Sequence, residues 1–422
     1  MKPLSVLIIS TWFPTPSRPA AGIFVERQTT YLQKECRQVM VVPTRVFPHL
    51  RIWKKIFKPG EFARIVAQWK FELDTTPQYR EINVDAERLP VYYPRFTSPP
   101  RQVSLGVWGY FAYPFMRTLL LRLHQQYKFD LIHAHYALPE GQIANFVQKW
   151  MKAPVVISIH GSDLGYAVRA NQLNRIMIRK VLRSASAILV NSTKTADGIL
   201  QYCNSPEKIK LVRLGANPPP SDVSVASCKK ILNILTVGYL IEQKGHAFML
   251  NAIQALIRDG YKLHYTIVGD GPEEQNLRSM CSELGIEDCV SFEGYKSHED
   301  VWPYFSKCDI FALPCWNEAF GLVYIEALTM GKPVIGCWGE GGPDDLHSLG
   351  DCIEMVKPRD VASLVEALKR LIDNPERREM MGRIGREIVQ QYYSWERTAA
   401  DSLEIYHQIL ENYKGTVGTD LK

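Results

Sequence analysis

Two carboxylates, with seven residues between them, flank a glycine in the second half of the chain. Glu318 follows an apolar run, Gly321 is expected to open a helix, and Glu326 lies two turns further along. The backbone N–H groups of Phe320, Gly321 and Leu322 would then form a ready site for a phosphate. Carboxylates beside it could accept hydrogen bonds from ribose and sugar hydroxyls, which suits a nucleotide sugar. The alternative is a surface helix with two solvated glutamates.

A second candidate segment begins at Gly238 and Tyr239, directly after the apolar run 233–237, and ends at Gly245. Its Lys244 is predicted to begin a helix, where an ammonium group can meet a phosphate as a mobile cation. A merely solvated lysine is disfavoured there by the positive end of the helix dipole. The segment 269–272 (GDGP) lacks the third glycine of a dinucleotide fingerprint, so we interpret it as a tight turn.

The first half of the chain offers histidines at the ends of apolar runs. His160 ends the run APVVISIH, and His133 and His135 alternate with apolar residues in DLIHAH, so these two share one face. A histidine at the carboxyl end of a strand can contact a sugar or a phosphate, and a buried structural role is an equal alternative. Gly22, after the first strand and a proline-rich loop, would allow an acceptor to approach closely.

The sequence indicates neither a bound metal ion nor disulfide bonds. No two aspartates are spaced i, i+2, so the Asp-x-Asp pair that would hold a sugar diphosphate through a metal ion is missing. Lysine, backbone amides and helix dipoles must then balance the phosphate charge, and we expect no cofactor and no metal. Nine cysteines form no C-x-x-C pair, which favours a reducing, cytoplasmic location.

The elements that must position these residues form two α/β domains. Short β-rich apolar runs alternate with helical patterns in each half, which indicates βαβ units and parallel sheets. The alternation stops around 217–222 (NPPPSD) and then restarts. We therefore predict an N-terminal acceptor-binding domain over 1–216, a linker over 217–229 and a donor-binding domain over 230–395. Helix 396–414 is expected to pack back onto the first domain, and a ligand belongs at the strands' carboxyl ends, between the domains.

Charge is divided unevenly between the halves of the 422-residue chain, whose formal net charge is +6. Residues 1–200 hold 27 Lys and Arg against 12 Asp and Glu, whereas residues 201–422 hold 23 against 32. This division argues against a symmetric barrel, a repeat array or a uniformly basic DNA-binding protein, and no nucleic-acid partner is expected. The densest basic and aromatic stretch, 45–70, suits an anionic membrane surface, with a solvated basic face as the alternative.

The longest apolar stretch, 103–116, is too short to cross a bilayer. It carries five aromatic residues and could lie at a membrane interface. A core segment of the first domain is the interpretation we favour.

On these residues the chain resembles the family 4 glycosyltransferases over almost its full length. Glu318 and Glu326 match the family's E-x7-E motif, and 238–245 resembles its glycine–basic–x4–lysine loop. The segments GDGP, HGSD and GKPVIGCWGEGGPDDL also match in position, and the N-terminal segments resemble a surface-polysaccharide subgroup. The resemblance implies the GT-B fold, two doubly wound Rossmann-like domains facing across a cleft, with the C-terminal helix returning to the N-terminal domain.

The resemblance also implies retaining transfer of a hexosyl group from a nucleoside diphosphate sugar to a lipid-linked or polysaccharide acceptor. Glu318 would contact the donor sugar and Glu326 the ribose, while Lys244 would neutralise the leaving diphosphate. Amides near Gly321 and Leu322 would bind that diphosphate. His160 would touch the sugar or phosphate from the opposite domain. Such an enzyme is expected on the inner face of the cell membrane as a peripheral protein.

One residue departs from the family pattern. Many relatives have Arg where this sequence has Tyr239, and a phenol supplies no second positive charge. Either Arg213 or Lys296 substitutes, or the donor is held more weakly, or activity is reduced or lost. A non-catalytic nucleotide-sugar-binding subunit of a polysaccharide assembly system is therefore the alternative function. An NAD-dependent oxidoreductase is disfavoured because no strand is followed by G-x-G-x-x-G.

Overall fold

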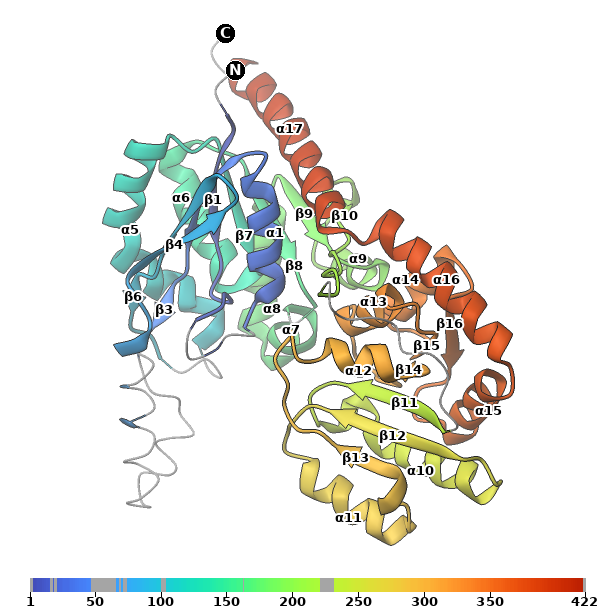
Figure 1. The fold of residues 1–422 in the computed structure, drawn as a ribbon. Helices are drawn as coiled ribbons and strands as arrows, with labels where there is room; N and C mark the ends of the chain where they lie inside the picture. Colours follow the sequence, from blue (N-terminus) through green and yellow to red (C-terminus); the bar gives the residue numbers. More distant parts are fainter. Residues whose placement is uncertain are drawn as a thin grey trace. The chain divides into compact units, whose positions relative to one another are not determined.

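The computed structural model describes residues 3–15, 18, 21–46, 66–67, 70, 74–99, 104–161, 163–220 and 231–419. The chain divides into two compact units (Figure 1). Unit 1 comprises Met1–Asn191, Thr195–Val212 and Trp395–Lys422, and unit 2 comprises Ser192–Lys194 and Arg213–Ser394. Most of the predicted linker, 217–229, and most of the basic stretch 45–70 lie outside the described residues.

Unit 1 is built on an eight-stranded sheet with the order β10-β9-β8-β7-β1-β2-β5-β4. All neighbouring strands are parallel except β4 and β5, which form an antiparallel hairpin at the edge. The strands are β1 (Ser5–Ile9), β2 (Arg37–Val41), β4 (Tyr79–Val84), β5 (Glu87–Tyr92), β7 (Leu131–His135), β8 (Val155–Ile159), β9 (Ala187–Val190) and β10 (Ile209–Leu211). A separate two-stranded sheet pairs β3 (Thr44–Arg45) with β6 (Arg95–Phe96).

Helices cover both faces of this sheet, so its central strands are apolar on both sides. Along β1, Leu7 and Ile9 join one apolar core while Val6 and Ile8 join another. The first core contains α5 (Trp108–Tyr127), α6 (Gln142–Met151) and α8 (Gln172–Ser184), and the second contains α1 (Ile23–Gln33) and α17 (Trp395–Thr419). The short helix α7 (Val168–Ala170) and all but the first two residues of α9 (Thr193–Leu200) also belong to this unit.

The C-terminal helix α17 packs on unit 1, as the resemblance implied. It lies against α1, where the Gln28 amide donates to the Ser402 hydroxyl at 3.1 Å. Its Tyr406 hydroxyl lies 2.6 Å from Nδ1 of His133 on β7. The predicted return of this helix to the N-terminal domain is therefore confirmed (Figure 1).

Unit 2 is built on a six-stranded parallel sheet with the order β13-β12-β11-β14-β15-β16. The strands are β11 (Leu232–Val237), β12 (Leu263–Val268), β13 (Val290–Phe292), β14 (Ile310–Ala312), β15 (Val334–Cys337) and β16 (Ile353–Val356). Its helices are α10 (His246–Arg258), α11 (Glu274–Leu284), α12 (Trp302–Lys307), α13 (Leu322–Thr329), α14 (Gly341–Leu349), α15 (Val361–Ile372) and α16 (Pro375–Tyr392). Two apolar cores again lie on opposite faces, which gives the second doubly wound unit that the alternation predicts.

The structure shows the state of the cysteines and the lengths of the apolar helices. The eight cysteines in the described part of the chain are free thiols, and most are buried, where a thiol behaves as a small apolar group. No helix among the described residues is long and apolar enough to span a bilayer.

Candidate functional site

The loop between β14 and α13 places the residues of the E-x7-E motif. The buried Tyr324 hydroxyl donates to the Leu313 carbonyl at 2.7 Å and contacts Cys315 Sγ at 3.1 Å, which ties the helix to the end of the strand. Gly321 caps α13 in the left-handed region, with φ of 83°, and a Cβ there would lie 2.7 Å from the Tyr324 ring. The turn at Gly321 therefore requires glycine.

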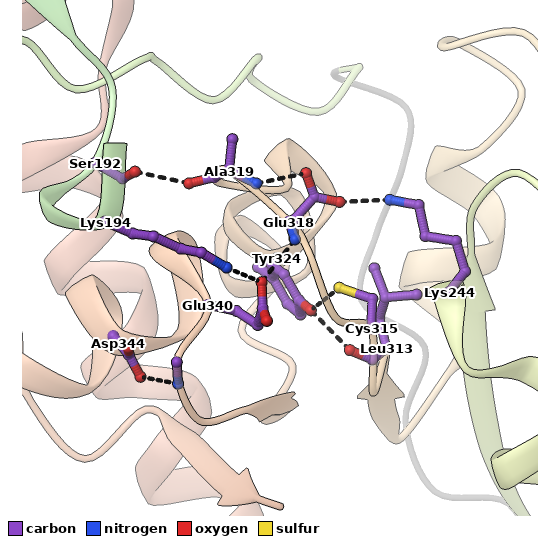
Figure 2. Close-up of polar contacts among 11 residues, drawn as sticks. Ser192, Lys194, Lys244, Leu313, Cys315, Glu318, Ala319, Tyr324, Glu340 and Asp344 are labelled. Carbon is purple, nitrogen blue, oxygen red and sulfur yellow. Dashed lines mark hydrogen bonds and ion pairs between the residues drawn. The ribbon is translucent and has the colours of Figure 1, made fainter. Parts of the chain in front are cut away.

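Glu318 precedes this helix and forms an ion pair with Lys244 (Figure 2). Lys244 Nζ lies 2.5 Å from Glu318 Oε2, and each side chain is one-fifth exposed. Burial works to lower the pKa of Lys244, but the nearby Glu318 carboxylate outweighs it and raises that pKa overall. The two predicted residues are thus brought together as a charged, solvent-reachable pair.

Glu340, to which the sequence analysis assigned no role, fixes the backbone of Glu318. Its buried carboxylate accepts a hydrogen bond from the Glu318 amide at 2.6 Å and pairs with Lys194 Nζ at 2.5 Å (Figure 2). The only sequence signal was its place in GKPVIGCWGEGGPDDL. After it, Gly341 and Gly342 bring α14 so close that a Cβ on either would lie within 2 Å of a backbone oxygen of Ala319 or Phe320.

A short segment from the first half of the chain completes this arrangement within unit 2. Ser192 donates its hydroxyl to the Ala319 carbonyl at 2.7 Å, and the Thr193 amide donates to Asp345 at 3.2 Å. Together with Lys194, these residues hold the loop that carries Glu318 (Figure 2). Local spacing could not indicate these contacts, because the partners are well over a hundred residues apart in the chain.

Glu326 lies in the second turn of α13 and is buried. Burial raises the pKa of its carboxyl group to about 7. His298 Nδ1 lies 3.6 Å from its Oε1, and the other ring nitrogen of His298 lies 2.6 Å from the Asn217 amide. Glu318 lies before the helix, as predicted from the sequence, and is held there by Lys244 and Glu340.

The helix start beside Glu318 has the properties of an anion site. No side chain caps α13, and the first N–H groups of a helix have no acceptor within it. Phe320 is buried with its ring 5.5 Å from that of Tyr393, so it fixes the loop by packing. The backbone amides at Phe320, Gly321 and Leu322 are therefore positioned to serve a ligand.

The segment 238–245 differs from its prediction in one respect. Lys244 ends a short 3₁₀ turn, Glu242–Lys244, and the helix α10 begins only after Gly245, so the lysine precedes the helix. The turn 269–272 is more than a local bend. A Cβ on Gly269 would lie 2.0 Å from the Gly238 carbonyl oxygen, so glycine here lets two loops pack directly together.

Tyr239 is 54% exposed, and its phenol brings no charge to the site. The guanidinium of Arg213 lies over the rings of Tyr392 and Tyr393, at 5.9 Å and 5.7 Å. Lys296 Nζ lies 5.8 Å from the Tyr304 ring. Both of the cations considered as substitutes for the family arginine are thus engaged with aromatic rings.

The histidines of unit 1 form one buried cluster at the ends of β7 and β8. His135 Nδ1 lies 3.1 Å from His160 Nε2 with the rings stacked, and His133 stacks on His135 with ring centroids 4.3 Å apart. Burial lowers the pKa of His133 and of His160 to about 3 and the pKa of His135 well below its usual value. All three are therefore neutral at pH 7.

The members of this cluster have different surroundings. His133 is satisfied on both ring nitrogens, by Tyr406 and by Ser158, which is a structural role. His160 Nδ1 is buried and has no hydrogen-bond partner in the part of the chain that the structure describes. A buried ring nitrogen without a partner is what a ligand hydroxyl could satisfy, with His135 holding the ring in place.

Gly22 caps α1 in the left-handed region, with φ of 68°. A Cβ there would lie 2.3 Å from the Trp12 carbonyl oxygen, so glycine lets the loop after β1 fold against the helix start. The same loop is held by Glu140, which the sequence analysis did not identify. Its buried carboxyl accepts from the Thr11 amide at 2.7 Å, and burial raises its pKa to about 8.

The two units place the chain among the doubly wound α/β proteins, in which ligands bind at the carboxyl ends of the strands. Comparison with known proteins makes the class specific. The family model "Glycosyl transferase 4-like domain" matches residues 33–215, and the model "Glycosyl transferases group 1" matches residues 225–388. The chain belongs to the glycosyltransferases of the family 4 type, with the GT-B fold.

Individual proteins agree with this assignment. The chain is 28% identical over 382 residues to a Bacillus subtilis protein named as a teichuronic acid biosynthesis glycosyltransferase, TuaC, covering 87% of this chain and 89% of that protein. A sucrose-phosphate synthase structure from Thermosynechococcus elongatus has a TM-score of 0.73 at 20% identity, covering 97% of this chain and all of that one. Anabaena HepE in complex with UDP-glucose has a TM-score of 0.65 at 19% identity, covering 98% of this chain and all of that one.

Proposed function

We propose that this glycosyltransferase moves a hexosyl group from a nucleoside diphosphate sugar to an acceptor hydroxyl, with retention and without a metal ion or cofactor. The observation that carries the proposal is the Lys244–Glu318 pair beside the uncapped start of α13. The determined complex of HepE with UDP-glucose, a protein of the same fold, supports a nucleotide-sugar donor.

The donor diphosphate would lie on the amides of Gly321 and Leu322, at the positive end of the helix. It would take Lys244 from Glu318, since both side chains are reachable from solvent. The released Glu318 carboxylate can then accept hydrogen bonds from hydroxyls of the sugar. Glu326, buried four residues into the helix, would accept from the ribose hydroxyls.

In the reaction, the bond between the anomeric carbon and the diphosphate oxygen breaks and its electron pair leaves on the diphosphate. The acceptor oxygen bonds to that carbon on the face from which the diphosphate departs, and its proton passes to the departing oxygen. Lys244 and the helix amides stabilise the developing charge, which is an electrostatic contribution. His160 would contact the transferred sugar or its phosphate as a neutral imidazole.

We propose a lipid-linked or polysaccharide acceptor on the unit 1 side, near Gly22 and His135. We also propose that the enzyme is cytoplasmic and meets the inner, anionic face of the membrane through the basic stretch 45–70. Most of that stretch lies outside the described residues, and Arg45 itself donates to the Ser98 carbonyl at 3.1 Å.

A non-catalytic nucleotide-sugar-binding subunit is the second candidate, because Tyr239 provides no second cation. Both functions require donor binding, and only turnover separates them. The sequence-level alternative of an NAD-dependent oxidoreductase is set aside by the family assignment.

The test is a thermal-shift screen of the protein against UDP-, GDP- and ADP-sugars, followed by transfer assays with the donor that binds. We expect one donor to raise the unfolding temperature and to be consumed with a lipid-linked or glycan acceptor in the presence of a chelator. NMR of the product should give the anomeric configuration of the donor. Binding without any transfer would favour the binding subunit.

The variant Glu326→Ala should abolish donor binding or turnover. Glu283→Ala, an exposed glutamate on α11, is the matched control and should behave as the wild type. Near wild-type activity of Glu326→Ala would overturn the site assignment.

A further inference from the structure

Three neighbouring helices of unit 1 carry many cations and no carboxylate. The helices α5, α6 and α8 pack together over one face of the sheet, opposite α1 and α17 (Figure 1). Their sequences contain no Asp or Glu. Their basic residues are exposed on the outer side: Arg117, Arg122, Lys149, Arg175, Arg179, Lys180 and Arg183.

Nearby acids do not offset this charge. Glu140 and Asp163, in the connections next to α6 and α8, are buried and hold backbone amides of the interior. Asp130, after α5, accepts from the Ser5 amide at 3.0 Å. Within the described residues, none of the seven cations forms an ion pair with a carboxylate. The positive charge of this surface is therefore presented to solvent.

The same helices expose large apolar side chains. Phe115 is 57% exposed and Ile176 is 49% exposed, and Tyr110, Phe111 and Leu173 are each about two-fifths exposed. These five are among the twelve large apolar residues that are exposed in the described part of the chain. The stretch 103–116 thus has two sides: the predicted core on one and aromatic residues facing solvent on the other.

The exposed Tyr110 of α5 lies beside residues of α6 and α8. A groove of about 200 Å³ is lined by residues from all three helices, including Tyr110, Phe146, Lys149, Met177 and Lys180. Within it the Tyr110 ring meets the Phe146 ring edge-on at 5.0 Å, and Lys149 Nζ lies 5.7 Å from that ring. Apolar and cationic side chains are therefore interleaved along it.

We propose that this surface, the α5–α8 surface, docks on a lipid bilayer that contains anionic headgroups. Exposed aromatic and aliphatic side chains enter the boundary between headgroups and acyl chains, while lysine and arginine reach the phosphates. Aromatic residues are favoured at that depth because one end is apolar and the other is wet. The proposal rests on the α5–α8 surface alone and is independent of the transfer reaction and of the stretch 45–70.

Charge complementarity favours an anionic bilayer over a second copy of the chain or a soluble polyanion as the partner of this surface. A second copy of the chain packed symmetrically would place the same cations against one another. A soluble polyanion would satisfy the cations but leave Phe111, Phe115 and Ile176 in water. Only an anionic bilayer offers both an apolar phase and a negative surface.

The size of the electrostatic effect sets the expected result. Each cation near an anionic membrane contributes ~1 kcal/mol, which is roughly a fivefold change in partitioning. Reversing three cations is therefore expected to weaken binding by about 100-fold or more. Binding should also fall with added salt, because screening shortens the reach of the surface potential.

The test is sedimentation or flotation of the full chain with vesicles of phosphatidylcholine, with and without phosphatidylglycerol. We expect strong binding only to vesicles that contain phosphatidylglycerol. The variant R179E/K180E/R183E should lose about 100-fold in partitioning, and F111S/F115S/I176S should lose at least tenfold.

Control variants carry changes of the same kind elsewhere. K262E/K307E/K357E makes the same change in net charge at exposed lysines of unit 2, and L200S/I231S removes exposed apolar residues outside the surface. Both should bind vesicles much as the wild type does. Equal losses in the charge-reversed variant and its control would overturn the proposal, as would undiminished binding of F111S/F115S/I176S.

Two further measurements distinguish this surface from the stretch 45–70 and from the proposed reaction. K54E/K55E/K58E tests the stretch 45–70, and loss of binding in that variant alone would overturn the α5–α8 surface. Donor-induced thermal shifts should be unchanged in the surface variants, which also shows that they fold. A protein that binds vesicles but no nucleotide sugar would sink the proposed reaction and leave this surface standing.

Discussion

Lys244 has two roles in the protein that compete for the same ammonium group. In the structure its Nζ pairs with Glu318, at 2.5 Å, while the proposed reaction requires it beside the leaving diphosphate. An ion pair that is one-fifth exposed can exchange partners, because water can solvate the carboxylate that is released. In the protein without donor, the ion pair therefore keeps both Lys244 and Glu318 charged and in position.

Replacing Lys244 by methionine should lower kcat by about 100- to 1,000-fold, the effect of removing one preorganised donor from a developing anion. The measurement is steady-state kinetics with the donor found in the screen. Lys262→Met, at an exposed lysine of the same unit, is the control and should keep wild-type rates. A change of less than threefold in Lys244→Met would show that another group stabilises the leaving diphosphate.

Donor affinity should depend on pH through Glu326, whose pKa burial raises to about 7. Below that pH the group is protonated and loses capacity to accept hydrogen bonds from two ribose hydroxyls. The donor should therefore bind roughly tenfold more weakly at about pH 6 than at about pH 8. Calorimetry with the intact nucleotide sugar measures this, since a free diphosphate product has its own pKa near 6.

Glu326→Gln is the matched variant for this pH dependence. It should bind the donor more weakly and lose the pH dependence that Glu326 contributes, because a glutamine amide does not ionise. A wild-type affinity that stays constant between about pH 6 and pH 8 would contradict the role of Glu326.

At the scale of elements, the start of α14 holds the loop before α13 in place. Glu340 accepts from the Glu318 amide, and the two glycines that follow let the helix approach the backbone of 319–320. The positions of the catalytic candidates thus depend on a contact between two helix starts, with no ligand involved.

Gly342→Ala should disturb this contact, because a Cβ there would lie 1.9 Å from the Phe320 carbonyl oxygen. We expect a loss of about 1–3 kcal/mol in the free energy of unfolding, together with weaker donor binding. Gly165→Ala is the control, since a Cβ there meets no atom within 4 Å. Denaturant unfolding and calorimetry measure both effects, and equal stabilities of the two variants would refute this account of α14.

Many of the strands that the sequence predicted are buried on both faces, although the half-buried β13 was predicted as well. Runs such as 6–9 and 310–312 are apolar throughout, as is typical of central parallel strands. The hairpin of β4 and β5 was missed because β4 alternates exposed and half-buried residues, YREINV, at the edge of the sheet. The three-residue β10 is too short to leave a pattern.

The site was predictable in part for a similar reason. Glu318, Glu326 and Lys244 lie in segments where residue type and local spacing indicate a phosphate ligand. Glu340 and Lys194 act through contacts with residues far along the chain, and spacing within a sequence does not report such contacts. Their roles emerge only from the tertiary structure.

At the scale of the whole molecule, the structure shows where part of the positive charge of residues 1–200 lies. Seven of the cations of residues 1–200 lie on the carboxylate-free helices α5, α6 and α8. Buried titratable groups form a second pattern that spans both units: three neutral histidines in unit 1, and the carboxyls of Glu140 and Glu326. These groups make the stability of the protein depend on pH.

The two kinds of group act in opposite directions. The histidines are protonated more readily in the unfolded chain than in the folded one. Their contribution to the free energy of unfolding is therefore fully present above about pH 6.5 and is lost as pH falls below that value. Glu140, with a pKa near 8 when folded, holds its proton more tightly in the folded state. Its contribution is therefore lost as pH rises from about 4.5 to 8. Buried thiols such as Cys36 and Cys308, whose pKa values burial raises to about 12, add to the decline as pH approaches 9.

We expect the free energy of unfolding to fall by about 2 kcal/mol between about pH 6.5 and pH 9 through Glu140, with a further decline through Glu326. Glu140→Gln keeps the shape and the acceptor for Thr11 but cannot ionise, so its decline should be shallower by about that amount. Urea unfolding at several pH values measures the difference, with the exposed Glu87→Gln as control. Parallel profiles for Glu140→Gln and the wild type would mean that Glu140 is already ionised in the folded protein, and the hold on the loop after β1 would then be that of a carboxylate.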